Sequence, residues 1–484
     1  VYSGLLRIGP DGTLQPDLAE AIELSADGRT YRITLRRDAR FHDGTPVTSR
    51  DVVYTLQLIQ DPDLKSPLRG NWTDVTITAV DEYELTVSLE EAYAPFIENF
   101  TVGILPAHIW SDLPTEQIPF SQINTEPIGS GPFQIERAER DSSGIITRYQ
   151  LTSFPQSYQP ARIDEIKLLF FTNEEALATA LREGQIDATA YLDGEIVTEF
   201  ADAGFSLHQE ALPRSFGVFF NQNRSPALRD AAVREALEVA LDRSALVEAA
   251  VAGLGFPNAL PTPFSTSTIE SRDGIASTSS PTSTATAILR AAGWELNDGR
   301  WEKTIDEVTE PLTITVRTGN SPVFTALADA LTAQWEAIGV DVITEQYEQA
   351  GLVQSVIRPR DFQALLYGID LSRSYDLYPF WHSSQQDDPG LNIAQYANVT
   401  VDELLETARV ATSSEVRTTQ LRAAEAIIEE ERPAIFIFQP ALIYLTDADL
   451  SVTLPNRIGR PSDRFSLITD WHLESEQLWP WFRD

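Results

Sequence analysis

The sequence predicts an α/β fold of more than one domain, and two observations carry this prediction. The chain has 484 residues, of which 42% are hydrophobic and 22% charged, so it is long enough for about two to four domains with substantial cores. Segments whose apolar residues alternate, as in half-buried strands, are interspersed with segments whose apolar residues recur three and four positions apart, as in helices. No repeated unit of sequence accompanies this alternation.

The first clear strand and helix are joined by a tight polar turn. Apolar residues alternate over 31–35, which predicts a strand with one buried face. The turn at 41–46 reads FHDGTP, in which Gly44 can adopt a positive φ and the proline fixes its own φ. Thr48 is followed three positions later by Asp51, a pattern similar to a capping box, which predicts the start of an amphipathic helix.

The next part of the chain is mostly strands. Residues 75–79 and 85–89 alternate on either side of a polar turn, which predicts a β-hairpin. Residues 128–135 predict a glycine turn that leads into a strand. The run at 166–171, apolar except for Lys167, predicts a strand buried on both faces, and a helix is expected at 174–183.

From residue 228 onward helical spacing dominates. Apolar residues form one continuous stripe over 233–241. The Ser/Thr-rich residues 264–286 predict a surface loop, and Thr282 to Thr284 are expected to cap a helix at 285–292. The remaining predicted elements alternate in type: strand 313–316, helix 322–338, strand 340–344, strand 364–370, helices 401–411 and 414–431, and strand 434–438.

Composition excludes several functions. The chain has 36 basic and 72 acidic residues and a net charge of -36. Because such a surface repels phosphate backbones and anionic lipid, nucleic acid is excluded as a partner. Cysteine is absent, which excludes disulfides, thiolate metal sites and a cysteine nucleophile. No apolar run is long enough to span a membrane.

No catalytic, metal or cofactor site is predicted. The five histidines are far apart in sequence, and none lies in an H-E-x-x-H pattern. Ser130 lacks the glycines of a nucleophile elbow, since Ile128 and Pro132 stand in their places. Residues 129–131, Gly-Ser-Gly, are a weak phosphate-loop candidate and are more typical of a structural turn. Carboxylates are so numerous that a hydrolase using a carboxylate pair stays open as an alternative.

Several segments resemble the family 5 extracellular solute-binding proteins, the peptide, dipeptide and nickel receptors of ABC importers. Residues 28–56, GRTYRITLRRDARFHDGTPVTSRDVVYTL, resemble the signature of that family. Residues 230–253 are similar to its V-R-x-A-L-x-x-A-I-D-R helix, and 287–294, AILRAAGW, to its A-x-x-L-L-x-x-A-G-W element. Residues 392–409 and 424–439 match its C-terminal portion, so the resemblance runs from residue 1 to about 445.

The resemblance implies a bilobal periplasmic-binding-protein fold of type II with an extra small α/β domain. In the order of the family, lobe I would comprise 1–10, 130–245 and 446–484. The extra domain would be 11–129, and lobe II 246–445. The opening V-Y-x-G-L segment lies some tens of residues into mature members of the family. We therefore expect an N-terminal strand and an export signal or lipid anchor to precede residue 1.

The implied function is that of a receptor and not of an enzyme. Such a receptor captures a small solute, here expected to be a di- or oligopeptide, between its lobes by hinge closure. It then delivers the solute to an ABC permease at the membrane. We expect a monomer without cofactor or metal, located outside the cytoplasm. Three alternatives stay open: the same fold binding an oligosaccharide or a metal chelate, a secreted acidic hydrolase, and a signalling or chaperone-like descendant with a closed pocket.

One strand end is the main candidate for ligand contact. In peptide-binding members of the family, a strand ending in aromatic-x-x-Asp lines the cleft, and Tyr367, Gly368, Ile369 and Asp370 match it position by position. The resemblance implies that the carboxylate pairs with the α-ammonium of the peptide and that the strand backbone pairs with its main chain. A surface carboxylate that merely ends a strand is the plainer interpretation. Residues 371–375 look like a small insertion beside this candidate.

Two further segments match the family less closely. Phe220 and Asn221 lie in a segment similar to its aromatic-x-F-N element, where the amide could bond a ligand backbone or cap the strand end. Residues 376–385, DLYPFWHSSQ, resemble a subgroup pattern, D-P-Y-x-F-W-H-S-S-Q, with leucine in place of proline. Tyr378 and Trp381 could wall a pocket there, although buried aromatic residues more often belong to a core.

Overall fold

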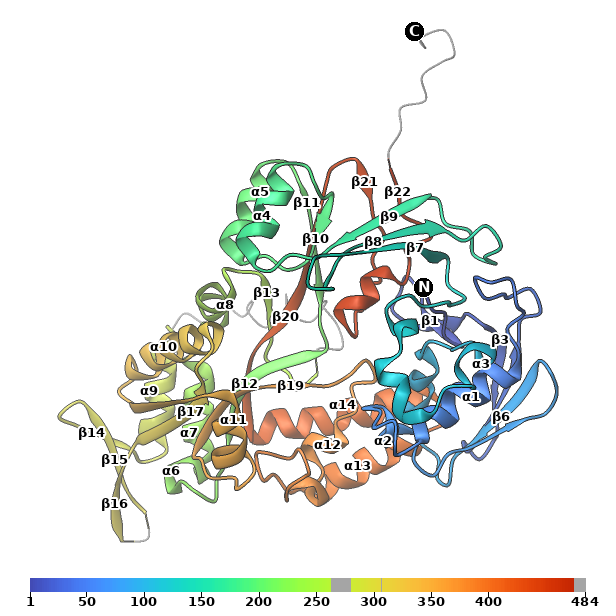
Figure 1. Cartoon of the computed structure of the whole chain (residues 1–484). Coiled ribbons are helices and arrows are strands. Elements are labelled where there is room, and N and C mark those ends of the chain that lie inside the picture. Colours follow the sequence, from blue (N-terminus) through green and yellow to red (C-terminus); the bar gives the residue numbers. More distant parts are fainter. Residues whose placement is uncertain (263–279, 306, 474–484) are drawn as a thin grey trace.

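The computed structural model describes residues 1–262, 280–305 and 307–473. Its largest sheet has eight strands in the order β10-β20-β12-β19-β17-β18, with β11 and β13 also paired to β20. β20 is the longest of the described strands, and its first part pairs with β12 and β13 while its second part pairs with β10 and β11 (Figure 1). The strands are β10 (Ala188–Thr189), β11 (Ser206–Ala211), β12 (Arg214–Phe220), β13 (Gly255–Pro257), β17 (Thr313–Gly319), β18 (Asp341–Tyr347), β19 (Ala364–Asp370) and β20 (Ala434–Thr446).

The neighbouring strands β12 and β19 of this sheet are buried on both faces. In β12, Val218 and Phe220 pack into one core cluster, and Phe219 between them packs into the other, because successive side chains of a strand point to opposite faces. The helices of the first cluster are α6 (Pro226–Arg229), α7 (Ala231–Val239), α8 (Arg243–Val251), α9 (Pro281–Ala291) and α10 (Pro322–Glu336). Those of the second are α11 (Gln349–Leu352), α12 (Tyr378–Trp381), α13 (Val399–Val410) and α14 (Ser414–Glu431).

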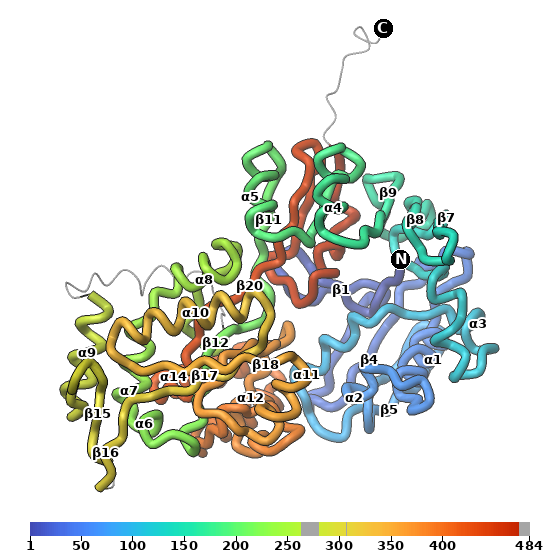
Figure 2. Tube along the Cα trace, turned by 60° about the vertical axis from the view of Figure 1, so that its left-hand side comes forward, coloured from blue at the N-terminus to red at the C-terminus, as the bar shows by residue number. Residues whose placement is uncertain are grey.

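The N-terminal part forms a separate four-stranded sheet, β3-β4-β6-β5, with its own apolar core (Figure 2). The capping box of Thr48 and Asp51 forms as expected, and Gly44 has φ of 88°. The elements here are β1 (Leu6–Ile8), β2 (Leu14–Pro16), β3 (Ala19–Leu24), β4 (Thr30–Leu35), α1 (Ser49–Gln60), α2 (Arg69–Trp72), β5 (Thr76–Ala79), β6 (Glu84–Ser88), the 3₁₀ helix η1 (Ala94–Thr101) and α3 (Ala107–Trp110).

A third group of elements lies above the gap between the first two in Figure 1. It contains the sheet β7-β8-β9, the helices that flank β10 and β11, and the C-terminal strands. A further small sheet, β14-β15-β16, projects from the opposite end of the molecule. Their bounds are β7 (Phe133–Arg140), β8 (Ile146–Ser153), β9 (Glu165–Leu169), α4 (Glu174–Arg182), α5 (Gly194–Asp202), β14 (Glu295–Asn297), β15 (Arg300–Ile305), β16 (Val308–Pro311), β21 (Leu450–Ser451) and β22 (His472–Leu473).

Three local predictions need correction. The run at 166–171 forms the edge strand β9 only as far as Leu169, and no residue of that strand is buried. The stripe at 233–241 is not one helix to its end, because α7 stops at Val239. α9 starts at Pro281 with Ser280 as its cap, so the cap lies before the predicted Thr282 to Thr284. Most of the predicted Ser/Thr-rich loop lies outside the described residues.

The predicted division into lobes at residues 10, 129, 245 and 445 stays a prediction. Strand pairing assigns strands to sheets, and it does not define which bodies move together. Among the helices that the structure describes, none is long and apolar enough to cross a membrane.

Candidate ligand-binding cavity

A cavity of about 980 Å³ lies where the separate parts of the fold meet. This volume is at the upper end of the range of about 300–1,000 Å³ that small-molecule sites occupy. Its walls come from the N-terminal segment with β1, from η1, from the sheet β7-β8-β9, from the loop after β19, and from the C-terminal segment at 459–469. Segments that are remote in sequence therefore share one site.

The N-terminal segment is held against the turn that precedes β7. The Gly131 amide donates to the Val1 carbonyl at 2.7 Å. A Cβ atom at Gly129 would lie 2.2 Å from the same carbonyl oxygen, so this position accepts no side chain without a shift of the backbone. The Gly-Ser-Gly turn thus serves a close approach between two backbone segments, which agrees with the structural interpretation and gives no support to a phosphate loop.

Asp370 lines the cavity, and its carboxylate already pairs with a cationic side chain of the protein. The antiparallel register of β12 and β19 places Arg214 opposite Asp370, and the Arg214 Nε donates to Asp370 Oδ2 at 3.1 Å. The Ser372 amide donates to the other carboxylate oxygen at 3.1 Å. Both side chains are about half exposed, so the ion pair remains open to a ligand.

A second ion pair in the cavity joins the loop after β19 to the C-terminal segment. The Arg373 guanidinium pairs with Asp463, and both side chains are largely buried. Asp463 also accepts from the amides of Gly459 and Arg460, each at 2.8 Å. A Cβ atom at Gly459 would lie 2.8 Å from Arg373 Nη2, so the glycine leaves room for the guanidinium.

Two carboxyl groups of the cavity are buried enough to titrate abnormally. Burial raises the pKa of Glu98, on η1, to about 7, although the guanidiniums of Arg373, Arg417 and Arg460 act against the rise. Burial also raises the pKa of Asp17, against the effect of a hydrogen bond from the Tyr158 hydroxyl. The cavity therefore contains groups whose charge depends on pH and on what enters beside them.

The residues before Asp370 in β19 do not line the cavity. Ile369 is buried in the core. The Tyr367 ring stacks on Phe324, with 6.4 Å between the ring centroids. A Cβ atom at Gly368 would lie 3.1 Å from the ring of Phe216. Of this predicted group, the structure brings only Asp370 to the cavity.

Phe220 and Asn221 are buried at the opposite end of β12. Phe220 is fully buried in the core, and Asn221 is 2% exposed. The Asn221 Nδ2 donates to the Arg360 carbonyl at 2.9 Å, and its Oδ1 accepts from the Asn223 amide at 3.2 Å. This is the strand-end capping that the sequence offers as the alternative to ligand contact.

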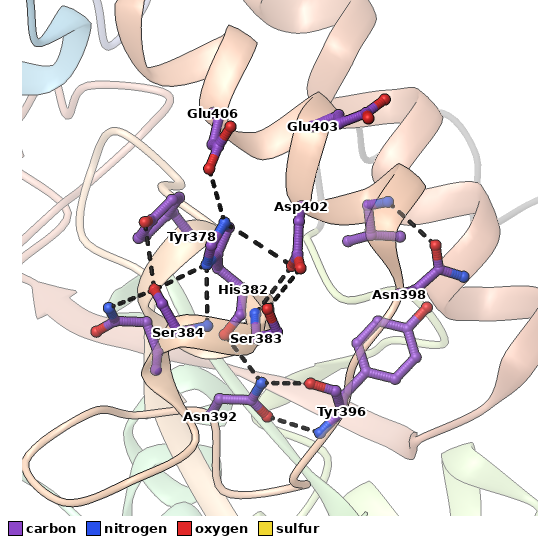
Figure 3. A network of polar contacts seen from close by, with 12 residues as sticks. Tyr378, His382, Ser383, Ser384, Asn392, Tyr396, Asn398, Asp402, Glu403 and Glu406 are labelled. Carbon is purple, nitrogen blue, oxygen red and sulfur yellow. Dashed lines mark hydrogen bonds and ion pairs between the residues drawn. The ribbon is translucent and has the colours of Figure 1, made fainter.

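Tyr378 and Trp381 lie on α12, away from the cavity. Trp381 is fully buried and packs beside Phe219 and Phe436. The Tyr378 ring stacks on His382, with 4.1 Å between centroids. Figure 3 shows the polar network of which these two residues are part: His382 contacts the Ser384 hydroxyl through Nδ1 at 2.8 Å and Glu406 through Nε2 at 3.2 Å. The network joins α12 to α13 and shares no residue with the cavity wall.

Sequence reasoning missed all the charged residues of the cavity except Asp370, namely Arg7, Asp17, Glu98, Arg214, Arg373, Arg460 and Asp463. Each is an isolated charge in a chain with many, and no local pattern marks it. The insertion at 371–375, noted beside Asp370, was the one available signal, since it contains Arg373. In the described residues, no group of three or more His, Cys, Asp or Glu side chains could hold a metal ion.

Comparison with known proteins identifies the family. The family model described as bacterial extracellular solute-binding proteins, family 5 Middle, matches residues 13–389. The chain belongs to this family. Among curated relatives, the oligopeptide-binding protein AppA of Bacillus subtilis (strain 168) is 26% identical over 461 residues, 91% of this chain and 81% of the relative. Protein XP55 of Streptomyces lividans is 28% identical over 465 residues, 94% and 80% of the two chains.

Solved structures show the same fold. The unliganded open form of MppA, a periplasmic murein tripeptide binding protein, matches with a TM-score of 0.79 at 20% identity, covering 98% of this chain and 91% of that one. NikZ from Campylobacter jejuni in complex with Ni(L-His) matches with a TM-score of 0.69 at 23% identity, covering 97% and 93%. The predicted family and the predicted α/β, bilobal fold with an extra small domain are confirmed. This family consists of solute-binding receptors, and its description places them outside the cell.

Proposed function

We propose that this family 5 protein is the receptor of an ABC importer and that it captures a di- or oligopeptide in the cavity described above. The observation that carries the proposal is the position of that cavity, whose walls come from the N-terminal part, from the loop after β19 and from the C-terminal segment. A ligand that touches all these walls would favour the arrangement in which they are closest, which is the physical basis of hinge closure.

The large sheet has one part that contains β10 and β11 and another that contains β12 and β19, and the connections between these two parts support this mechanism. β11 and β12 are separated only by residues 212–213, and β20 passes alongside them through Pro440. The Gln439 Nε2 donates to the Leu212 carbonyl at 2.7 Å and so ties the two connections together. Two short connections that are bonded to each other would allow the two parts of the sheet to rotate relative to one another without separating. We propose that the cargo is then passed to a permease, outside the cytoplasm, and that the receptor acts as a monomer.

A peptide fits the charges of the cavity. The Asp370 carboxylate has lone pairs beyond those used by Arg214 and Ser372, so it could accept a peptide ammonium as well. Relatives named as oligopeptide-binding point to the same cargo. A metal chelate is the second candidate, because NikZ was solved with Ni(L-His). A chelate brings ligands of its own and would not need a metal site built by the chain.

Native mass spectrometry of gently purified protein tests the cargo directly. We expect a copurified peptide, or a peptide that binds on addition. Binding should reduce the radius of gyration and raise the unfolding temperature together, since ligand at a hundredfold excess over Kd stabilises the folded state by about 2.7 kcal/mol. A copurified nickel chelate or saccharide would replace the peptide assignment, and turnover of a peptide or glycoside would contradict the receptor function.

The role of Asp370 is tested by a four-way comparison. Asp370→Asn keeps the shape of the side chain but removes its charge, so binding of a tripeptide with a free α-amine should weaken by about 2–5 kcal/mol. The N-acetylated tripeptide should bind the original protein poorly and lose little more in the variant. Purely additive losses, measured by titration calorimetry, would remove Asp370 from the ammonium site.

A further inference from the structure

Among the described residues, four arginines line the cavity, and they differ in how their charge is compensated. Arg214 pairs with Asp370 and Arg373 pairs with Asp463. Arg460 is exposed, so water solvates it. Arg7 is only partly exposed, and its Nε is enclosed without a hydrogen-bond partner, as is that of Arg373, but among the described residues Arg7 has no ion pair of the kind that Arg373 makes with Asp463. An enclosed N–H group of a guanidinium that has no acceptor is costly.

The strand that carries Arg7 explains why its side chain faces the cavity. In β1, Leu6 and Ile8 are buried and Arg7 between them is only partly buried. Alternate side chains of a strand point to opposite faces, so Arg7 points away from Leu6, which packs in the N-terminal core, and Arg7 lines the cavity together with atoms of both neighbours.

Asp17 is the carboxyl group that attracts Arg7, and it compensates the charge incompletely. The attraction acts at a distance, without an ion pair between the two side chains among the described residues. The Asp17 carboxylate instead accepts a hydrogen bond from the Tyr158 hydroxyl. Burial raises the pKa of Asp17, and the attraction of Arg7 acts against that rise.

We propose that Arg7 is an anion subsite of the cavity and that the cargo carries a carboxylate which this guanidinium binds. The inference rests on the proposed use of this cavity for cargo and specifies its chemical class. A planar guanidinium matches a carboxylate with two parallel hydrogen bonds. The net charge of -36 repels anions from the protein as a whole, so an anionic cargo requires a local cation that no protein carboxylate has neutralised.

A carboxylate fits better than a phosphate. Asp17, Glu98 and Asp370 line the same cavity, and a ligand group with nearly two negative charges would be repelled by them more strongly than a group with one. In a peptide cargo, the α-carboxylate is the group that would meet Arg7. Its ammonium would then lie towards the acidic residues of the same cavity.

The test compares tri-alanine with its C-terminal amide, by titration calorimetry on the original protein, Arg7→Gln and Arg7→Lys. Tri-alanine should bind Arg7→Gln about 30-fold or more weakly than the original protein, as expected when one partner of a desolvated charge pair is removed. The amide should bind both proteins with similar affinity. Arg7→Lys keeps the charge but loses the planar fork of the guanidinium. Its affinity for tri-alanine should therefore lie between those of the original protein and Arg7→Gln.

Arg137→Gln is the matched control. It removes the same charge from β7, where the Arg137 side chain is 68% exposed and lies outside the cavity wall, and it should leave both affinities unchanged. Thermal unfolding of each variant shows that the comparison is made on folded protein. If Arg7→Gln does not fold, the Arg7→Lys variant and the amide carry the test alone.

The outcomes separate this inference from the proposed function. If tri-alanine and its amide bind the original protein equally, Arg7 is not a carboxylate site, while the peptide function stands. Suppose that neither tri-alanine nor its amide binds, and that the copurified cargo is a different carboxylate which binds Arg7→Gln more weakly than the original protein. The inference then stands and the peptide function fails. A cargo without any anionic group overturns both.

Discussion

Two adjacent parts of the segment after β19 lie in different environments, one in the cavity wall and one in the core. Residues 372–374 line the cavity, where Arg373 is held by Asp463. A few positions later, α12 turns inward, and Trp381 is fully buried between the sheet and α13. The two parts share a neighbourhood in sequence and in space, yet one supplies charge to the cavity and the other supplies apolar area to the core.

The difference between Arg373 and Trp381 follows from how each side chain is stabilised. An aromatic residue gains most by leaving water completely, whereas a guanidinium must keep a partner or solvent. In this segment, burial places Trp381 in the core, and pairing with Asp463 allows Arg373 to remain in the cavity wall. Elsewhere aromatic residues do line the cavity, namely Tyr2, Tyr93, Phe133 and Phe465.

The largest effect is expected in the core. Trp381→Ala should lower the free energy of unfolding by about 3–5 kcal/mol, because it removes a large side chain from a packed site and leaves a void. Denaturant unfolding measures the loss. The Kd for cargo, measured well below the unfolding temperature, should stay unchanged. A raised Kd in a folded variant would place Trp381 at the ligand after all.

An intermediate effect on the free energy of unfolding is expected from pH. It can be compared between a carboxyl group of the cavity and one of the core. Burial raises the pKa of Glu98 in the cavity and of Glu425 in the core from 4.5 to about 7. Each group binds its proton more tightly in the folded state, so its contribution to stability is fully present below about pH 4.5 and is lost as pH rises through about 7. Each therefore contributes a fall of at most about 1.4 kcal/mol per pH unit in that window.

Glu98→Gln and Glu425→Gln should each flatten the pH dependence of the unfolding free energy between these two values. The matched pair sharpens the comparison, since Glu98 lines the cavity and Glu425 instead accepts hydrogen bonds from the Thr262 amide and hydroxyl. Only Glu98→Gln should also change the Kd for cargo. An equal change in both variants would mean that the two carboxyl groups affect binding through global stability.

The smallest effect is expected at Asp370, at the exposed end of β19. Asp370→Asn should change the unfolding free energy by less than about 1 kcal/mol, because Arg214 and Asp370 are both about half exposed and water screens their attraction. Chemical denaturation measures this change. A loss as large as that of Trp381→Ala would show that the ion pair holds the fold and would weaken its assignment to the ligand.

Local pattern was sufficient for much of the fold. The strand 364–370 was predicted with the bounds that β19 has, and the helix 414–431 with those of α14. The turn at Gly44 and the cap at Thr48 also formed as expected. These features depend on residues within a few positions of one another, so the sequence itself contains the information that determines them.

Only the tertiary structure decided which faces became cavity and which became core. The apolar run of β9 looked fully buried, but it lies at the edge of a small sheet, and Ile166 and Leu168 face the cavity. Arg7 and Asp463 stand at opposite ends of the chain and line one site. Periodicity shows that a strand or helix has an apolar face, but what covers that face depends on the packing of segments that are remote in sequence.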